Sequence, residues 1–510
     1  MTGRQPEKQK SEKAGFVLSV PCIACVRTVR FFKKGKGIFM IQFGTGGWRA
    51  IIGDEFTKAN VRLLTKAIAE KMKNDEQTPD GFVIGYDRRF LSEEAAKWSA
   101  EVMAGEGIPC RVINREAPTP LIMFAVKYYD LPYGIAVTAS HNPAIYNGVK
   151  VFSKGGRDAD QFLTDELERY IRGVDPEEIK SVPFEAGVKQ GLIEVIDPMN
   201  PYIDTIIRSV NMDSIRSRNL KVALDPMYGV SKTALQTILL TARCDVDVIH
   251  ERRDALFGGR LPAPNHKTLA SLINYVEEKR CDIGIATDGD ADRLGVIDDR
   301  GEFLHPNKIL VLLYYYLIKY KGWHGAVVRN LATTHLLDRI AEDFDEICYE
   351  VPVGFKYVSS KMQETNAIIG GESSGGLTVR GHIQGKDGIF AAALLVEMLA
   401  VTGRKLSEIY GDITAGYGGC EMVECDFSFS PENREKIAQV LFTDKLLPDF
   451  DYEIEKVSYM DGCKIYFKNN GWIIARFSGT EPLLRIFCEM PTQKAAEETA
   501  EIFKQFLFLS

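Results

Sequence analysis

The sequence lacks the cysteine patterns that would mark a zinc site or a disulfide framework. Its 510 residues include ten scattered cysteines, and no pair at zinc spacing is repeated. That density is far below the density of disulfide-stabilised scaffolds. Cys22 and Cys25 have the spacing of a redox pair, but they stand alone ahead of any folded pattern. We therefore expect reduced thiols in a cytoplasmic protein.

The N-terminal region lacks a segment that could cross a membrane. Its apolar run, from Phe16 to Val26, is too short to span a bilayer. A basic cluster follows this run and no small-residue cleavage site is evident, which argues against a signal peptide. We expect residues 1–39 to be a disordered or misassigned extension, and the folded protein to begin at Met40.

An excess of positive charge is also absent. The formal net charge is −7, which gives no bulk attraction to nucleic acid or to anionic lipid. We therefore expect neither a nucleic-acid partner nor a membrane partner, while the oligomeric state stays open.

What is present is an ordinary globular composition, with 45% hydrophobic and 26% charged residues. The length exceeds one hydrophobic core, since domains usually contain roughly 100–200 residues. From Met40 onward, short β-branched runs alternate with amphipathic helical stretches, which is typical of α/β layers. The pattern predicts α/β domains over residues 40–196, 197–300 and 301–415, and a smaller α+β domain over 416–510.

Several elements can be predicted individually. Apolar residues recur at helical spacing after Asn60, a plausible N-cap, and residues 81–87 form a buried strand. Residues 282–287 form another. In the tail, residues 464–467 and 472–475 are expected to pair across the turn Asn469-Asn470-Gly471.

Three aspartates follow the strand at 282–287 at alternate positions. Asp288, Asp290 and Asp292 can converge on one hard cation, because Gly289 frees the backbone to curl. Oxygen ligands alone suit Mg²⁺ better than zinc. An EF-hand loop needs glycine at its sixth position, where this chain has Arg293. We expect a magnesium site, with an acidic surface loop as the alternative.

The stretch Thr138 to Pro143 places a serine at the exit of the apolar run Ile135-Ala136-Val137. Ser140 has no Gly-x-Ser-x-Gly elbow, so acyl transfer by a serine triad has little support. Read together with the three aspartates, it suggests a serine that carries a phosphoryl group beside a bound cation. His141 could shift protons or could only hydrogen-bond the loop.

Charge balance requires basic groups near such a site. Three carboxylates and a phosphoserine of about −2 outweigh one divalent cation. Arg49, Lys150 and Arg293 are the nearest candidates by motif, since arginine matches phosphate geometry and lysine can take or give a proton. Arg49 ends the glycine-rich stretch that begins at Phe43, which matches neither the dinucleotide nor the Walker pattern.

Two further glycine-containing loops follow predicted strands. The stretch 370–376 contains Glu372 and Ser374, which can bond sugar hydroxyls, with a flexible turn as the alternative. The stretch Arg476 to Pro482, followed by Arg485, offers amides, hydroxyls and guanidiniums to a phosphate dianion. Because ligands of open α/β sheets bind at the carboxyl ends of strands, we expect the four loops to converge on one cleft.

With these motifs in hand, the chain from Met40 to its C-terminus resembles the α-D-phosphohexomutase superfamily, the phosphoglucomutase/phosphomannomutase group. The likeness covers four motifs in order: 138–143, 288–293, 371–376 and 476–482. It implies a heart-shaped arrangement of four domains, three similar α/β domains and a smaller C-terminal α+β domain.

The resemblance also implies roles for individual residues. Ser140 would be the phosphoserine and would share Mg²⁺ with Asp288, Asp290 and Asp292, assisted by Arg293. Glu372 and Ser374 would grip the sugar. The implied substrate-binding residues further include Gly354, from the stretch 353–356, Lys386, Arg476, Ser478, Gly479, Thr480 and Arg485. Lys386 would meet a phosphate or a hydroxyl, with a solvated lysine as the alternative.

The implied reaction is an isomerisation by phosphotransfer between C1 and C6 of a hexose, through a hexose 1,6-bisphosphate that acts as intermediate and activator. Some members of the family have histidine where this chain has Gly376, and the stretch 380–388 looks closer to glucose-handling members. We therefore expect glucose phosphate as the substrate, with mannose or glucosamine phosphate as the alternative within the family. A phosphoserine-using phosphatase and an inactive sugar-phosphate binder are the alternatives from other classes.

Overall fold

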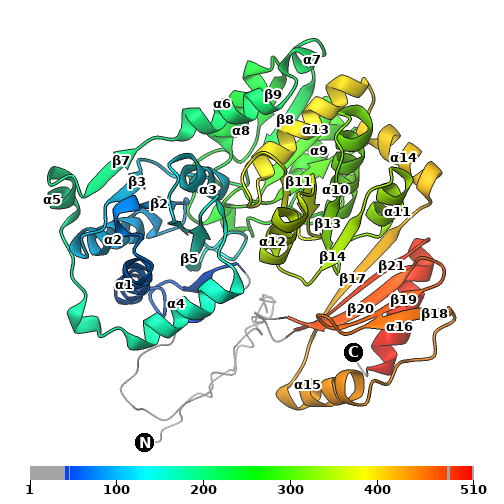
Figure 1. Ribbon diagram of the computed structural model, residues 1–510. Helices are drawn as coiled ribbons and strands as arrows, with labels where there is room; N and C mark the ends of the chain where they lie inside the picture. The colour runs from blue at the N-terminus through cyan, green and yellow to red at the C-terminus, as the bar shows by residue number, and fades with distance from the viewer. Residues whose placement is uncertain (1–40, 45, 479–482, 508–510) are drawn as a thin grey trace, which may run out of the picture. The chain divides into compact units, whose positions relative to one another are not determined.

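The computed structural model describes residues 41–44, 46–478 and 483–507, coloured by residue number in Figure 1. The predictions for residues 1–39, Cys22 and Cys25 among them, lie outside the described residues, as do those for Gly479 and Thr480. The eight cysteines in the described part of the chain are all free. In that part, no helix is long and apolar enough to cross a membrane.

The first sheet has seven strands in the order β1-β5-β4-β2-β3-β7, with β6 paired to β5. Its strands are β1 (Trp48–Ile51), β2 (Phe82–Tyr86), β3 (Cys110–Ile113), β4 (Tyr133–Val137), β5 (Tyr146–Ser153), β6 (Arg157–Asp158) and β7 (Ile193–Ile196). Its helices are α1 (Lys58–Asn74), η1 (Thr78–Asp80), α2 (Ser92–Gly105), α3 (Thr119–Tyr128), α4 (Gln161–Gly173), η2 (Pro176–Glu178) and α5 (Phe184–Lys189).

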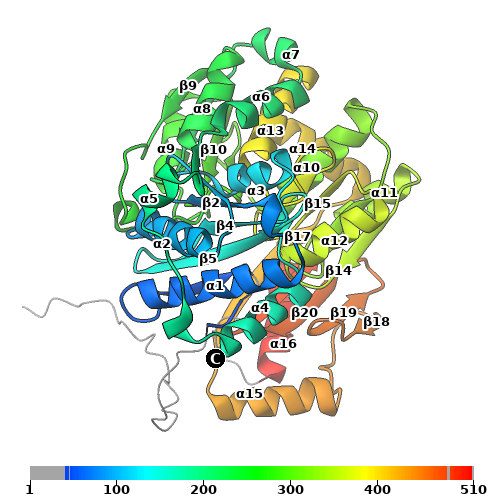
Figure 2. The ribbon, with the colours of Figure 1, turned by 60° about the vertical axis from the view of Figure 1, so that its left-hand side comes forward.

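Helices cover both faces of this sheet because its central strands are apolar at every position. In β2, Phe82 and Ile84 pack into one core with residues of α1 and α2, whereas Val83 packs into another with residues of α3. Figure 2 shows α1 and α4 running side by side. The predicted N-cap of α1 was wrong: Thr57 caps the helix, and its hydroxyl accepts from the amide of Asn60.

The second sheet has the order β12-β11-β10-β8-β9. Its elements are α6 (Met199–Ser209), α7 (Met212–Arg216), β8 (Lys221–Asp225), α8 (Lys232–Thr241), β9 (Asp245–Val248), η3 (Phe257–Gly259), α9 (Ala270–Lys279), β10 (Ile283–Thr287), β11 (Leu294–Ile297) and β12 (Phe303–Leu304). Strands β8, β9 and β10 are parallel to one another. Strand β11 runs antiparallel to β10, and β12 runs antiparallel to β11.

The third sheet has the order β14-β13-β15-β16, with only β16 antiparallel to its neighbour. Its elements are α10 (Pro306–Tyr315), η4 (Tyr316–Tyr320), β13 (Val327–Asn330), α11 (Leu336–Asp343), β14 (Cys348–Val351), α12 (Phe355–Thr365), β15 (Ile369–Gly371), β16 (Leu377–Val379), α13 (Gly388–Thr402) and α14 (Leu406–Tyr417). Helix α13 is apolar nearly all round because it packs on α7 and α8 of the second unit as well as on α10.

The fourth sheet is antiparallel throughout, in the order β17-β21-β20-β19-β18. Its elements are β17 (Glu421–Ser428), α15 (Pro431–Ala438), η5 (Gln439–Thr443), β18 (Ile454–Ser458), β19 (Cys463–Phe467), β20 (Trp472–Phe477), β21 (Leu483–Met490) and α16 (Gln493–Phe506). Helix α16 lies along this sheet (Figure 1). These four units confirm the predicted class of three α/β domains and an α+β domain, while the predicted boundaries stay predictions.

One topological feature recurs in all four sheets. Each predicted motif loop joins two antiparallel neighbours: β4 to β5, β10 to β11, β15 to β16, and β20 to β21. In the first three sheets the loop follows the last parallel strand, at its carboxyl end. The equivalence of these units is therefore visible in topology although the sequence shows no exact repeat.

Two hydrophobic faces are buried in the fourth sheet. Cys463, Ile465 and Phe467 of β19 pack with α16, whereas Tyr466 packs against Leu331 of the third domain. The ammonium of Lys464, on the same face as Tyr466, donates to the Leu331 carbonyl at 2.7 Å and to Glu350 Oε2 at 2.7 Å. This face therefore docks on the end of β13.

Candidate active site

The loop after β4 holds Ser140 in a strained conformation. Its φ is +52°, in the left-handed region that costs a non-glycine residue about 1 kcal/mol or more. The side chain is buried, and its hydroxyl donates to Asp288 Oδ2 at 2.8 Å. Strain of this kind persists only where surrounding contacts enforce it.

Arg89 supplies those contacts, and sequence reasoning missed it. Its buried guanidinium donates to the backbone carbonyls of Ser140 at 2.6 Å and Asn142 at 2.7 Å, and to two more at Pro143 and Tyr146. Asp87 holds the start of the loop, accepting from the Thr138 hydroxyl at 2.7 Å. The sequence signal was the run of three charged residues Asp87-Arg88-Arg89, directly after the buried strand β2.

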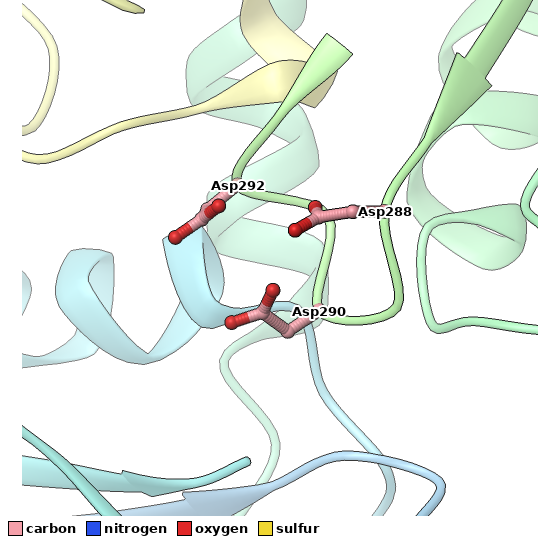
Figure 3. A group of neighbouring side chains, drawn as sticks. All are labelled: Asp288, Asp290 and Asp292. Atoms are coloured by element: carbon pink, nitrogen blue, oxygen red, sulfur yellow. The ribbon is translucent and has the colours of Figure 1, made fainter. Parts of the chain in front are cut away.

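The three aspartates converge as the sequence predicts. Asp288, Asp290 and Asp292 are fully buried, one carboxylate oxygen from each lies within 4.8 Å of the others, and Figure 3 shows the three side chains turned toward one another. Oδ1 of Asp290 and Oδ1 of Asp292 have no hydrogen-bond partner among the described residues. Buried oxygens without partners are costly unless something binds them, so this donor set fits a hard divalent cation such as Mg²⁺.

The carboxylates differ in their electrostatic environment. Burial and the charges of Asp290 and Asp292 raise the pKa of Asp288 well above its usual value. Burial alone would also raise the pKa of Asp292, but Lys150, Lys386 and Arg293 outweigh it and lower that pKa well below the usual range. The site therefore holds at least one firmly ionised carboxylate.

Two lysines meet these carboxylates. Lys150 Nζ lies 2.6 Å from Asp290 Oδ2 and 2.6 Å from Asp292 Oδ2, and Lys386 Nζ lies 2.9 Å from Asp292 Oδ2. Both lysines are buried, which excludes a solvated Lys386. With Arg293 they make three positive charges against three negative, so a divalent cation and a phosphoserine dianion would leave the site balanced.

His141 lies on the Ser140 loop, and Arg49 of β1 contacts that loop through its side chain. Arg49 Nη1 donates to Asn142 Oδ1 at 2.7 Å, and His141 Nδ1 lies 3.3 Å from the Ser140 hydroxyl. Burial and the charges of Arg293 and Arg49 lower the pKa of His141 well below its usual value, so its imidazole is neutral near pH 7. A neutral imidazole at this distance can accept a proton.

The sugar-loop candidate lies beside the aspartate loop. Leu294 N donates to the Gly375 carbonyl at 3.1 Å, and Arg293 forms a β-bridge with Gly376. A Cβ at Gly376 would lie only 2.3 Å from Cδ of Lys386, so the glycine makes room for the lysine stem. Lys386 therefore packs against the end of the sugar-loop candidate.

Glu372 is held from two sides, while Ser374 is exposed. Glu372 Oε1 accepts from Asn330 Nδ2 at 3.0 Å and from the amide of Gly354 at 2.9 Å. Gly354 therefore orients Glu372 through its backbone amide. The sequence did not indicate this contact.

The phosphate-loop candidate sets two arginines directly opposite each other. Arg476 of β20 pairs in register with Arg485 of β21, an arrangement that like charges disfavour. Arg476 Nε is buried and has no hydrogen-bond partner among the described residues, and its Nη2 lies 3.2 Å from Asp461 Oδ2. Ser478 N donates to the Leu483 carbonyl. An anion between the arginines would relieve their repulsion.

The structure therefore brings three of the predicted loops into direct contact, through Ser140 with Asp288, Lys150 with Asp290 and Arg293 with Gly376. The loop of Arg476 is joined to the sugar loop less directly, through Asp461 and the backbone at 353–354. The convergence of all four on one cleft stays a prediction.

Comparisons with known proteins agree with this geometry. Family models for phosphoglucomutase/phosphomannomutase α/β/α domains I, II and III match residues 40–178, 200–301 and 305–417, and the model for the C-terminal domain matches 434–505. A "Phosphoglucomutase/phosphomannomutase" of Thermococcus kodakarensis is 29% identical over 461 residues, covering 90% of this chain and 97% of the relative.

Two further relatives extend the agreement. A "Probable phosphoglucosamine mutase" of Pyrococcus abyssi is 31% identical over 463 residues, covering 90% of this chain and 96% of the relative. The crystal structure of a "putative phosphomannomutase" from Thermus thermophilus has a TM-score of 0.80 at 28% identity, covering 92% of this chain and 99% of that one. The chain belongs to the phosphoglucomutase/phosphomannomutase family of the α-D-phosphohexomutase superfamily, whose members are isomerases.

Proposed function

We propose that the protein interconverts a hexose 1-phosphate and the corresponding hexose 6-phosphate through a phosphoserine at Ser140 and a hexose 1,6-bisphosphate. The observation that carries this proposal is the strained, buried Ser140, whose hydroxyl faces Asp288 at 2.8 Å beside carboxylate oxygens without partners. A hydroxyl placed so can carry a phosphoryl group that a cation neutralises.

The chemical step transfers the phosphoryl group of the phosphoserine to the free hydroxyl of the sugar phosphate. The bond between Ser140 Oγ and phosphorus breaks while a bond from phosphorus to the sugar oxygen forms, and the hydroxyl proton leaves to a base. His141 is the candidate for that base by position. Despite burial, Asp290 and Asp292 raise the pKa of Lys150, so Lys150 is a charged ammonium that can donate a proton or stabilise the transferring group. The resulting bisphosphate turns over, and its other phosphoryl group returns to Ser140.

The remaining residues bind and orient. Asp288, Asp290 and Asp292 would hold Mg²⁺, which supplies charge neutralisation to the transferring phosphoryl group when bound. Glu372 and Ser374 would bond sugar hydroxyls, and Arg476, Arg485 and Ser478 would hold the phosphate that is not reacting. Gly479 and Thr480 keep the same proposed role.

The substrate sugar is better assigned from the relatives than from the sequence. The expected preference for glucose rested on the stretch 380–388, yet the similar proteins are named chiefly phosphoglucosamine mutase or phosphoglucomutase/phosphomannomutase. We therefore propose glucosamine phosphate or mannose phosphate ahead of glucose phosphate.

Initial rates on glucosamine, mannose and glucose 1-phosphates, with Mg²⁺ and trace bisphosphate, test both parts. We expect isomerisation of all three sugars to depend on Mg²⁺, and kcat/KM to be highest for glucosamine or mannose. Release of inorganic phosphate faster than 6-phosphate formation would instead favour a phosphatase. A glucose preference of tenfold or more would overturn the sugar assignment alone.

A further inference from the structure

Asp461 lies in the turn between β18 and β19 and reaches two partners on different elements. One carboxylate oxygen, Oδ2, accepts from the backbone amide of Val353 at 3.0 Å and lies 3.2 Å from Arg476 Nη2. Oδ1 accepts from the same Nη2 at 3.3 Å. The carboxylate therefore ties the candidate phosphate-binding arginine to the segment between β14 and α12.

The neighbouring Gly462 fixes this turn against β20. Its φ is +104°, and a Cβ there would lie 2.7 Å from the Ala475 carbonyl oxygen and 2.7 Å from Cβ of Arg476. Only glycine permits so close an approach in that conformation. Asp461 is thus presented to Arg476 by a backbone with little freedom.

The next residue of the tied segment holds the sugar loop. The amide of Gly354 donates to Glu372 Oε1 at 2.9 Å, and Asn330 Nδ2 donates to the same oxygen at 3.0 Å. Two adjacent backbone amides therefore hold the two carboxylates. The amide of Val353 donates to Asp461, and the amide of Gly354 donates to Glu372. Arg476 and Glu372 are thus joined through one dipeptide and the carboxylate of Asp461.

Asp461 is not what docks the fourth sheet on the third domain. That contact is made by Lys464 with Glu350 and the Leu331 carbonyl, and by the apolar packing of Tyr466 and Trp472 around Leu331. The side chain of Asp461 is 27% exposed, which leaves it a minor share of the docking energy. The main role of Asp461 is to orient the side chain of Arg476.

We propose that Asp461 is a positioning residue that sets the spacing between Arg476 and Glu372, so that the phosphate that is not reacting and the sugar hydroxyls are held at one spacing in either orientation of the bisphosphate. This rests on the proposed function, because only a flipping intermediate needs one spacing to serve two orientations. A tie that fixes the two residues before the substrate arrives lowers the cost of ordering them on binding, so its loss should appear mainly as weaker binding.

Asp461→Ala and Asp461→Asn separate the two contacts. Alanine removes both, whereas asparagine keeps an oxygen that can accept from the Val353 amide and loses the charge that faces Arg476. Glu453→Gln is the matched control, because Glu453 pairs with Lys468 on the exposed rim of the same sheet. KM for the preferred hexose 1-phosphate, kcat, and the bisphosphate released per turnover would be measured for each, together with the melting temperature.

For Asp461→Ala we expect KM to rise about tenfold and released bisphosphate several-fold, with kcat at saturating activator changed less than about threefold. Asp461→Asn should give a smaller rise, and Glu453→Gln none. A lower melting temperature with KM and bisphosphate release unchanged would overturn the proposal.

Measurements of ligand binding and of amide hydrogen exchange test the role of Asp461 without relying on mutase activity. On a Ser140→Ala background, calorimetry with glucose 1,6-bisphosphate should show weaker binding for Asp461→Ala, and amide exchange should accelerate at both Val353 and Gly354. If the parent protein isomerises no sugar phosphate, the proposed function fails while this binding result still supports the tie. Faster exchange at Val353 alone, with unchanged bisphosphate affinity, would refute the tie even in an active mutase.

Discussion

The aspartate loop and the docking face of the fourth sheet both bury several charges, yet they differ in one respect. At the aspartate loop, Oδ1 of Asp290, Oδ1 of Asp292 and Nε of Arg293 lack hydrogen-bond partners among the described residues. At the docking face, every buried polar atom of Lys464 and Glu350 has a partner. At the aspartate loop, carboxylate oxygens from three residues also lie within 4.8 Å of one another, which fits a bound cation. At the docking face, the paired charges hold two elements together.

We call the second group the docking cluster: Arg329, His335, Asp338, Glu350, Lys464 and Tyr466. Glu350 accepts from Lys464 at 2.7 Å, from Arg329 at 2.5 Å and from the Tyr466 hydroxyl. These donors outweigh burial and lower the pKa of Glu350 well below its usual range. Removing one charge should therefore have opposite effects on stability in the two regions.

The largest effect is expected at the aspartate loop. Asp288→Asn should lower isomerisation by about 100- to 1000-fold, because a carboxylate that neutralises the transferring group is lost. In a chelator, the same variant should raise the free energy of unfolding by about 1 kcal/mol, because a like charge is removed from a buried group. Asp130→Asn, at an exposed carboxylate paired with Lys154, is the control for both measurements. A variant that is inactive and also less stable would contradict the comparison.

Glu350→Gln should instead lower the free energy of unfolding by about 3 kcal/mol, measured by urea denaturation. It leaves the buried Lys464 ammonium without a counter-charge, and breaking a buried pair in this way typically costs about 3–5 kcal/mol. Glu364→Gln, from an exposed helical pair with Lys361, should change it by less than about 0.5 kcal/mol. Equal effects of the two substitutions would refute the structural role of the docking cluster.

The docking cluster should also give the protein an acid-sensitive step. Burial, Arg329 and Lys464 lower the pKa of His335 to about 3, and the Lys464 ammonium lies 3.0 Å from its Nε2. Because the unfolded chain titrates near 6.5, unfolding takes up a proton between these values, and stability falls as pH drops below 6.5.

From pH 7 to pH 5, we expect the free energy of unfolding to fall by about 2 kcal/mol less in His335→Gln than in the wild type. Glu350 keeps its contribution above pH 4.5. Burial and the charge of Arg329 lower the pKa of Lys464 to about 7, so Lys464 also titrates in this window, and the effect of His335 is the difference between the wild type and His335→Gln. His324→Gln, at a largely exposed histidine, is the control. An unchanged slope in His335→Gln would show that His335 is already protonated in the folded protein.

Magnesium binding should stabilise the folded protein modestly. A tenfold excess over its dissociation constant stabilises a protein that binds it only when folded by about 1.4 kcal/mol. We expect this shift in the wild type, about the same shift in Glu350→Gln and little in Asp288→Asn, measured by thermal unfolding with and without EDTA. A shift that survives in Asp288→Asn would place the ion elsewhere.

Local patterns predicted the parts of the site that lie within one loop. Asp288, Asp290 and Asp292 share a short glycine-containing turn, so their proximity to one another needs only local geometry. The approach of Ser140 to Asp288, 148 residues away, was inferred by reading the two motifs together. The class of each domain followed in the same way, from the alternation of strands and helices.

Contacts between distant segments could be predicted only in part. Arg89 holds carbonyls more than fifty residues downstream, which the sequence did not indicate. Charge balance predicted Lys150 near the aspartates, but not its ion pairs with Asp290 and Asp292, 140 and 142 residues away. Lys464 appeared to be an ordinary strand residue, because alternation along β19 does not reveal that both faces of its sheet are buried. Such groups are found only once the topology brings the strands together.

The central claim is that the Ser140 hydroxyl carries the phosphoryl group. Incubating the protein with glucose 1,6-bisphosphate and Mg²⁺, and mapping phosphate by peptide mass spectrometry, tests it most directly. We expect one phosphate at Ser140 that is lost to added hexose phosphate, and no mutase activity in Ser140→Ala. Phosphate on another residue, or turnover by Ser140→Ala at the parent rate, would contradict the account.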